Sequence, residues 1–215
     1  VPVDVAALPG DRIAVVDRKQ QAVTVLDTAN DAPRVYRWAA VQAPVSAAYD
    51  AQADAIWLAD ATAHACHLVQ LGGTVLRTIT GSGPLQLSFP TGVAYSARLG
   101  LIVADAMNFR IQLFTADGTP YLTFGQLGDA AGSFALPRDI AVDSAGHIYV
   151  LDNRFENVQV FNAAGQLLMV FGEGGSGPGQ FSVPSGITID GHDRIWIADS
   201  FNQRVQVFQY LGGAD

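Results

Sequence analysis

The stretch VPSGITIDGHDRIWIADSFNQRVQVF runs from Val183 to Phe208 and is one copy of a segment that recurs through the chain. Similar segments begin at Val1, Phe89 and Leu136 without a gap, and a weaker copy begins at Ala43. A proline recurs at positions 2, 44, 90, 137 and 184, and an aspartate follows it at 17, 60, 105, 152 and 199. An internal repeat therefore organises the whole chain.

The residues of each copy follow the pattern of short antiparallel strands. In the fourth copy, apolar runs occupy 140–142, 148–151, 158–161 and 167–171. Small, Asx and glycine residues separate them at 143–146 and 162–165, which is the composition of tight turns. The third run, Val-Gln-Val-Phe, alternates with a period of two, as a strand with two different faces does. Each repeat is thus predicted to form a four-stranded meander.

Four-stranded repeats of about 45 residues predict an all-β fold of the propeller type, in which sheets pack radially around an axis. We expect a single domain over 1–215, with repeats at approximately 1–42, 43–88, 89–135, 136–182 and 183–215. The last repeat stops after its third strand, so the chain supplies nineteen strands. Either five blades close into a ring, or a six-bladed ring is incomplete and another protein chain covers the gap, which is the alternative we favour.

The pattern D-x-x-N-x-R-[IV]-Q-x-F spans Asp105 to Phe114 and Asp199 to Phe208 and resembles the NHL repeat family. The Gly-rich segment FGEGGSGPGQFSVP is similar to the family's lead-in to a repeat. The resemblance implies a propeller, usually of six blades, and a family that contains protein binders, RNA binders and a few enzymes. It favours a non-catalytic binding or scaffold module for a protein, peptide or polysaccharide, with a metal-dependent lyase or lactonase-like hydrolase as the alternative.

The enzymes of this family use His or Glu/Asn ligands that converge on the central channel. This chain has two glutamates, and its four histidines do not recur at channel positions, so we expect neither a catalytic residue nor a metal or other cofactor. The net charge of −8 disfavours nucleic acid as a partner. The sequence lacks an apolar run long enough for membrane insertion, and we expect an extracellular or periplasmic protein whose signal sequence is not part of this chain.

The repeated aspartates are interpreted as structural residues that accept backbone N–H groups at a turn. An arginine five residues later can pair with such a carboxylate. These structural positions are Asp17, Asp60, Asp105, Asp152, Asp199, Arg110 and Arg204.

The entry to each proline and the loop after each aspartate must lie at the same end of a blade, because an even number of strands returns the chain to that end. We expect this end to form the binding face, since exposed aromatic and arginine side chains on loops often anchor interfaces. Its candidate residues are Asp4, Arg18, Lys19, Asn108, Phe109, Arg138, Asp139, Arg154, Phe155, Phe201 and Asn202. The three phenylalanines have an alternative role as packing residues between blades.

His64, Cys66 and His67 form the one local cluster of soft metal ligands. The repeat alignment puts Cys66 where other copies have Ile111, Val158 and Val205, which predicts a small buried side chain. His67 should point to the opposite face of its strand. We therefore interpret the cluster as structural.

Overall fold

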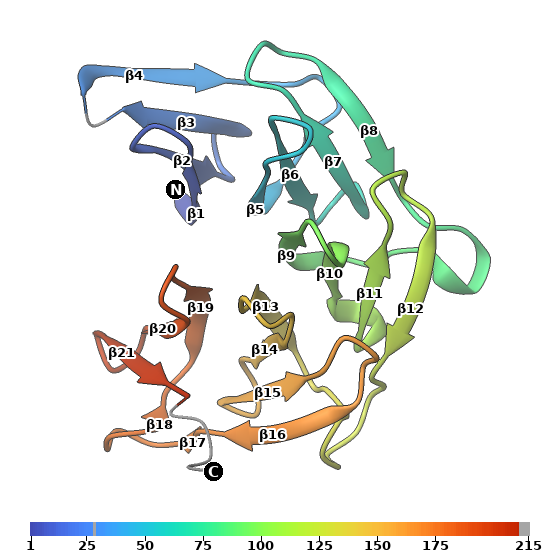
Figure 1. Ribbon diagram of the computed structural model, residues 1–215, viewed down its shortest axis with the longest axis vertical. Coiled ribbons are helices and arrows are strands. Elements are labelled where there is room, and N and C mark those ends of the chain that lie inside the picture. The colour runs from blue at the N-terminus through green and yellow to red at the C-terminus, as the bar shows by residue number, and fades with distance from the viewer. Residues whose placement is uncertain (28, 211–215) are drawn as a thin grey trace.

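The computed structural model describes residues 1–27 and 29–210, and its sheets follow the repeats (Figure 1). The first sheet contains β1 (Pro2–Leu8), β2 (Arg12–Asp17), β3 (Ala22–Asp27) and β4 (Asn30–Tyr36), and the second contains β5 (Pro44–Asp50), β6 (Ala55–Asp60), β7 (Ala65–Val69) and β8 (Val75–Ile79). The third contains β9 (Pro90–Ser96), β10 (Gly100–Asp105), β11 (Arg110–Phe114) and β12 (Pro120–Phe124).

The fourth sheet contains β13 (Pro137–Val142), β14 (Ile148–Asp152), β15 (Asn157–Phe161) and β16 (Leu167–Phe171). The fifth contains β19 (Pro184–Ile189), β20 (Arg194–Asp199) and β21 (Arg204–Gln209). Between them, β17 (Glu173–Gly174) and β18 (Gln180–Phe181) form a small parallel pair. Helical structure in the described residues is limited to two 3-10 turns, η1 (Gly83–Leu85) and η2 (Ala106–Asn108), and none of it could span a lipid bilayer.

All neighbouring strands within the five large sheets are antiparallel, and each repeated proline begins the innermost strand. Pro137 lies opposite Asp152, and a register shift follows before Asp139 pairs with Leu151. The same irregularity follows Pro2, Pro44 and Pro184. Proline has no N–H to donate, so the first position of a strand is one that it tolerates. The proline-to-aspartate spacing of 15 or 16 residues is therefore the length of one hairpin.

The innermost strands β1, β5, β9, β13 and β19 succeed one another around a central channel (Figure 1). Apolar side chains fill the space between successive sheets. Between the third and fourth sheets, for example, Ile102 and Leu113 pack with Ile140, Val150 and Phe161. The repeat thus buries both faces of each inner sheet against its neighbours, and the fold is a β-propeller.

The repeated aspartates connect each outgoing loop to the start of its own blade. The N–H groups of Ala135 and Leu136 donate to the Asp152 carboxylate at 2.8 and 3.1 Å, and those of Arg154 and Phe155 donate to it at 3.0 and 3.1 Å. Asp152 is fully buried. One carboxylate therefore accepts hydrogen bonds from backbone N–H groups on two segments, and these groups would otherwise lack an acceptor.

The first and fifth sheets face each other with no sheet between them in the described part of the chain (Figure 1). Val205 and Val207 of β21 are 60% and 46% exposed, whereas Val158 and Val160 at the same positions of β15 are buried. On the first sheet Val5 is 56% exposed. The described residues thus form five blades, with four strands in the first four and three in the last, and the ring is open.

Replacement of Asp152 by alanine should lower the free energy of unfolding by roughly 1–3 kcal/mol, because buried backbone donors lose their acceptor. Denaturant unfolding monitored by circular dichroism measures the change. Asp129→Ala removes an exposed carboxylate and should change stability by less than about 0.5 kcal/mol. Equal stabilities of the two variants would contradict a structural role for Asp152.

Candidate binding surfaces: the central channel and the loop face

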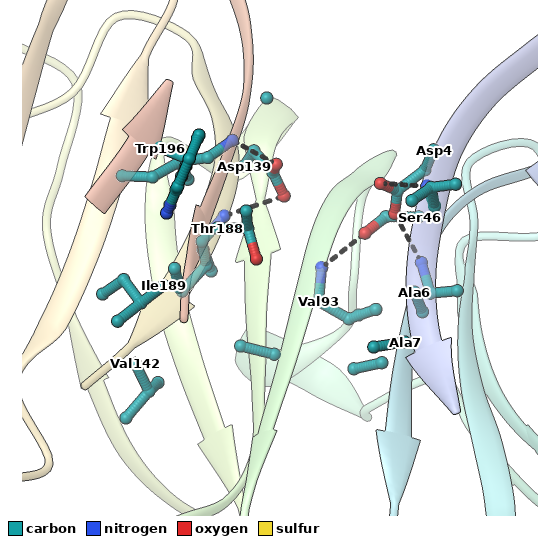
Figure 2. A pocket seen from close by; sticks show the side chains of 18 of the residues that line it. Asp4, Ala6, Ala7, Ser46, Val93, Asp139, Val142, Thr188, Ile189 and Trp196 are labelled. Carbon is teal, nitrogen blue, oxygen red and sulfur yellow. Dashed lines mark hydrogen bonds between the residues drawn. The ribbon is translucent and has the colours of Figure 1, made fainter. Parts of the chain in front are cut away.

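The central channel is a cavity of about 700 Å³ lined by the innermost strands of all five blades (Figure 2). Much of its wall is small and apolar, from residues such as Ala7, Ala48 and Val93. Tyr95 and Trp196 add aromatic surface, and the Trp196 indole N–H donates to Asp190 at 3.0 Å. The cavity could hold a small ligand or an inserted side chain.

The residue two places after each repeated proline lies on the innermost strand of its blade, at the same level in all five blades. These residues are Asp4, Ser46, Gly92, Asp139 and Gly186. Where the residue has an oxygen, it accepts an N–H from the innermost strand of the next blade. Asp4 accepts from Ala47 at 2.8 Å, Ser46 from Val93 at 3.1 Å, and Asp139 from Ile187 at 2.9 Å.

Glycine occurs at the positions on either side of Asp139 along the ring of inner strands. A Cβ atom on Gly92 would lie 2.7 Å from the Cα of Asp139, which is too close for any side chain. With no oxygen available from Gly92, the N–H of Ile140 donates to its own neighbour Asp139 at 2.9 Å. The N–H of Val5 donates to Asp4 in the same way, at 2.7 Å. All five N–H groups at this level of the channel are thereby satisfied.

Asp139 and Asp4 approach the channel from opposite walls (Figure 2). Burial, together with the nearby charge of Asp4, raises the pKa of Asp139 to about 8, although its two N–H donors act in the other direction. Burial also raises the pKa of Asp4. Since both oxygens of each carboxylate accept backbone N–H groups, we interpret the pair as links between blades.

The loop face gathers the loops that follow the repeated aspartates, but several of its expected residues turn inward. Asn108 donates to the Gln86 carbonyl at 2.9 Å and to Asp105, and Asn202 donates to the Gly175 carbonyl and to Asp199. Phe109 ends η2 with a φ of 55° and is half-buried. These side chains hold the loops in place.

The arginines of the repeat motif also bond within the fold. Arg110 donates to Asp105 at 2.7 Å and Arg204 to Asp199 at 2.8 Å. Burial opposes ionisation of Asp199, but donors from the Ser182 N–H, Asn202 and Arg204 together lower its pKa. The motif thus supplies hydrogen-bond donors to the buried carboxylate of its blade.

The side chains that remain available to a partner on the loop face are fewer. Phe201 is 74% exposed, and Arg18, Lys19 and Arg154 are exposed as well. Phe155 and Arg138 are half-buried.

The sequence did not single out Tyr95, Thr188 or Trp196 as channel residues. Only the side chains' orientation toward the axis identifies them, and the repeat pattern does not encode it.

The histidines do not converge on the channel. His64 accepts the Phe89 N–H at 2.9 Å, and His147 bonds to Asp143 at 2.8 Å. His67 is buried with its Nε2 atom 3.8 Å from Asp60, and burial lowers its pKa. Cys66 is fully buried beside it, and burial raises the pKa of its thiol. Among residues 1–27 and 29–210, no three His, Cys, Asp or Glu side chains are grouped so that they could hold a metal ion.

Comparison with known proteins supports the propeller. A family model described as a 6-bladed beta-propeller matches residues 142–213. The Drosophila melanogaster protein brain tumor is 37% identical over 68 residues, which cover 31% of this chain and 7% of that protein. The chain therefore spans a small part of this curated relative.

Solved structures resemble nearly the whole chain in fold. A structure of the nidogen/laminin complex matches with a TM-score of 0.79 and 17% identity over 97% of this chain and 76% of the other. Catalytically inactive H270A virginiamycin B lyase from Staphylococcus aureus matches with a TM-score of 0.70 and 15% identity, over 98% and 70% of the two chains. At these identities the likeness is one of fold alone.

Asp139 should make the stability of the protein fall as the pH rises from about 4 to about 8. Because its pKa is raised from the ordinary 3.8 to about 8 on folding, the folded state binds more protons than the unfolded state in this window. The Asp139→Asn variant should lose that part of the slope. Urea unfolding at several pH values tests this, with Asp129→Asn as a control for the loss of one carboxylate. A variant with the wild-type slope would contradict the assignment.

Cys66 should react slowly with a thiol reagent in the native protein, because its thiol is buried and the thiolate is the reactive form. Labelling in denaturant should be complete within minutes and provides the reference. Rapid native labelling, or protection that disappears when a chelator is added, would instead indicate an accessible or metal-bound thiol.

Proposed function

We propose that this propeller is a non-catalytic binding module of the NHL type, and that it presents its loop face to another protein. The observation that carries the proposal is the contrast on that face between fixed and free side chains. The repeated aspartates, asparagines and arginines fasten the loops to the blades. The residues between them are left exposed on a rigid support, which is the usual arrangement of a binding surface.

The chemistry of the exposed residues suits a protein partner. Met107, Arg154 and Phe201 lie on the corresponding loops of the third, fourth and fifth blades, and all three are exposed. Aromatic, methionine and arginine side chains are enriched in interfaces and carry much of their binding energy. The exposed Arg18, Lys19 and Arg154 of this face would pair with acidic residues of a partner. A peptide segment would meet the same side chains, and a polysaccharide could stack on Phe201.

Two of the related proteins support the proposal. A 68-residue part of this chain is 37% identical to the protein brain tumor, and the nidogen/laminin structure, which resembles this chain in fold, is that of a protein complex. An extracellular or periplasmic location would be consistent with such a module. The likeness to virginiamycin B lyase is one of fold. Both channel aspartates of this chain accept backbone N–H groups, which supports a structural role for them.

A double variant, Arg154→Ala with Phe201→Ala, should reduce capture of a protein partner at least tenfold, because two exposed anchors are lost. Its melting temperature should stay close to the wild-type value. The measurement is capture on the immobilised chain from the native source, quantified by mass spectrometry, with Arg34→Ala on β4 as a matched exposed control. Unchanged capture would contradict the loop face as the binding surface, and stoichiometric zinc in the purified protein would favour the lyase or hydrolase alternative.

A further inference from the structure

His64 and His67 of the second blade stand at two positions of the repeat where the fourth blade has Glu156 and Gln159. Counted from the repeated aspartate, the first position is four residues later and the second is seven residues later. The first belongs to the turn into the third strand, with a φ of 52° at His64 and 53° at Glu156. The second lies within the third strand, β7 or β15. The two blades can therefore be compared contact by contact.

The first position links its blade to the next one. The Glu156 carboxylate accepts the Val183 N–H at 2.9 Å. His64 Nδ1 accepts the Phe89 N–H, also at 2.9 Å. Val183 and Phe89 each precede the proline that begins the innermost strand of the next blade. An imidazole nitrogen can accept a hydrogen bond only while it carries no proton, so this link between the second and third blades requires neutral His64.

The second position faces the segment that leads into its own blade. In the fourth blade, Gln159 donates to the Ser133 carbonyl of that segment at 2.7 Å. Among the described residues, the His67 side chain bonds instead to Thr78 Oγ1, at 3.0 Å through Nδ1, and its buried Nε2 atom has no hydrogen-bond partner. The start of the second blade is therefore fastened by Asp60 without a bond from His67.

Asp60 is the charged group that His67 faces. Its carboxylate is fully buried and lies 3.8 Å from the imidazole Nε2 atom. It already accepts the N–H groups of Gln42, Ala43 and Ala63. A proton on His67 would place a charge in the interior, where it must be paired or hydrated. A shift of Asp60 toward the imidazolium would lengthen its bonds to those N–H groups.

The other charged groups on the elements around the two histidines have different partners or orientations. Arg37, the charged residue of the connecting segment 37–43, is exposed. Asp105, which is hydrogen bonded to the segment that His64 contacts, pairs with Arg110 at 2.7 Å. Cys66 faces the third blade, and burial raises the pKa of its thiol, which stays neutral. Proton uptake by the histidines themselves is therefore the change that mild acid brings to these contacts.

We propose that the second blade is an acid-sensitive element of the ring, which loosens from both neighbours at its loop-face end when His64 and His67 take up protons. Protonation removes the acceptor of the Phe89 N–H on one side and draws Asp60 away from the Gln42 N–H on the other. Histidine changes its charge between pH 5 and 8 and so responds to mild acid. The inference concerns the chain alone and does not depend on the function proposed above.

Burial lowers the pKa of His67 from the ordinary 6.5, so the folded contact holds this side chain neutral while the opened state is free to bind a proton. Opening is then favoured as the pH falls below 6.5, because the opened state binds more protons than the closed one. The same sign applies to His64, whose bond to the Phe89 N–H exists only in the neutral form. Acid therefore destabilises both contacts.

Amide hydrogen exchange followed by NMR on the whole chain at pH 7.5 and 5.5 tests the proposal. Protection factors remove the pH dependence of the intrinsic exchange rate. Between these pH values the protection of the Phe89 and Gln42 amides should fall about tenfold, because an opened histidine titrates near pH 6.5, one unit above the lower value. The Val183 amide, whose acceptor is a carboxylate at the position of His64, is the internal control and should change less than twofold.

His64→Gln and His67→Gln separate the two contacts, because glutamine does not titrate and is the residue at the second position in the fourth blade. The first variant should abolish the pH dependence at Phe89 alone, and the second that at Gln42 alone. His192→Gln changes an exposed histidine on the turn between β19 and β20 and should alter neither.

Constant protection of both amides in the wild type would overturn the proposal. An equal loss at Val183 would also overturn it, since that result indicates unfolding of the whole chain instead of a local opening. A loss at Phe89 alone would overturn the part assigned to His67.

Discussion

The fold depends on one buried carboxylate per blade, which accepts hydrogen bonds both from the segment that begins the blade and from the loop that follows the aspartate. Asp60 accepts the N–H groups of Gln42 and Ala43, and Asp152 accepts those of Ala135 and Leu136, so each aspartate fixes where the innermost strand of its blade begins. The outgoing turn donates to the same carboxylate, as Ala63 does to Asp60 at 3.0 Å. A buried acceptor with several donors is specific because any other register would leave those donors unsatisfied.

The innermost strands add a second constraint, which passes from blade to blade. An oxygen on one strand accepts an N–H from the next, and a glycine stands where the neighbouring backbone comes too close for a side chain. The residue type at this position therefore reflects the contact that is made there. Asp4, Ser46 and Asp139 each accept an N–H from the next strand, and Gly92 leaves space for the backbone of Asp139. The same arrangement gives the channel two opposed carboxyl groups, and each of their four oxygens accepts a backbone N–H.

The all-β propeller and its strands could be predicted from the sequence because both depend on local, repeated features: alternation, turns, and a proline-to-aspartate separation of 15 or 16 residues. The availability of individual side chains on the loop face could not be predicted in the same way. Asn108 and Asn202 donate to carbonyls more than 20 residues away, and Asp139 accepts from a residue 48 positions later. Such contacts depend on how blades meet in space, and in the sequence an asparagine that fastens a loop looks the same as one that faces solvent.

The open side of the ring follows from the same geometry. A sheet in a propeller has two apolar faces and needs a neighbour on each, a condition that the second, third and fourth sheets meet. The first and fifth sheets each have one neighbour among the described residues, and the valines on their outer faces are exposed in consequence.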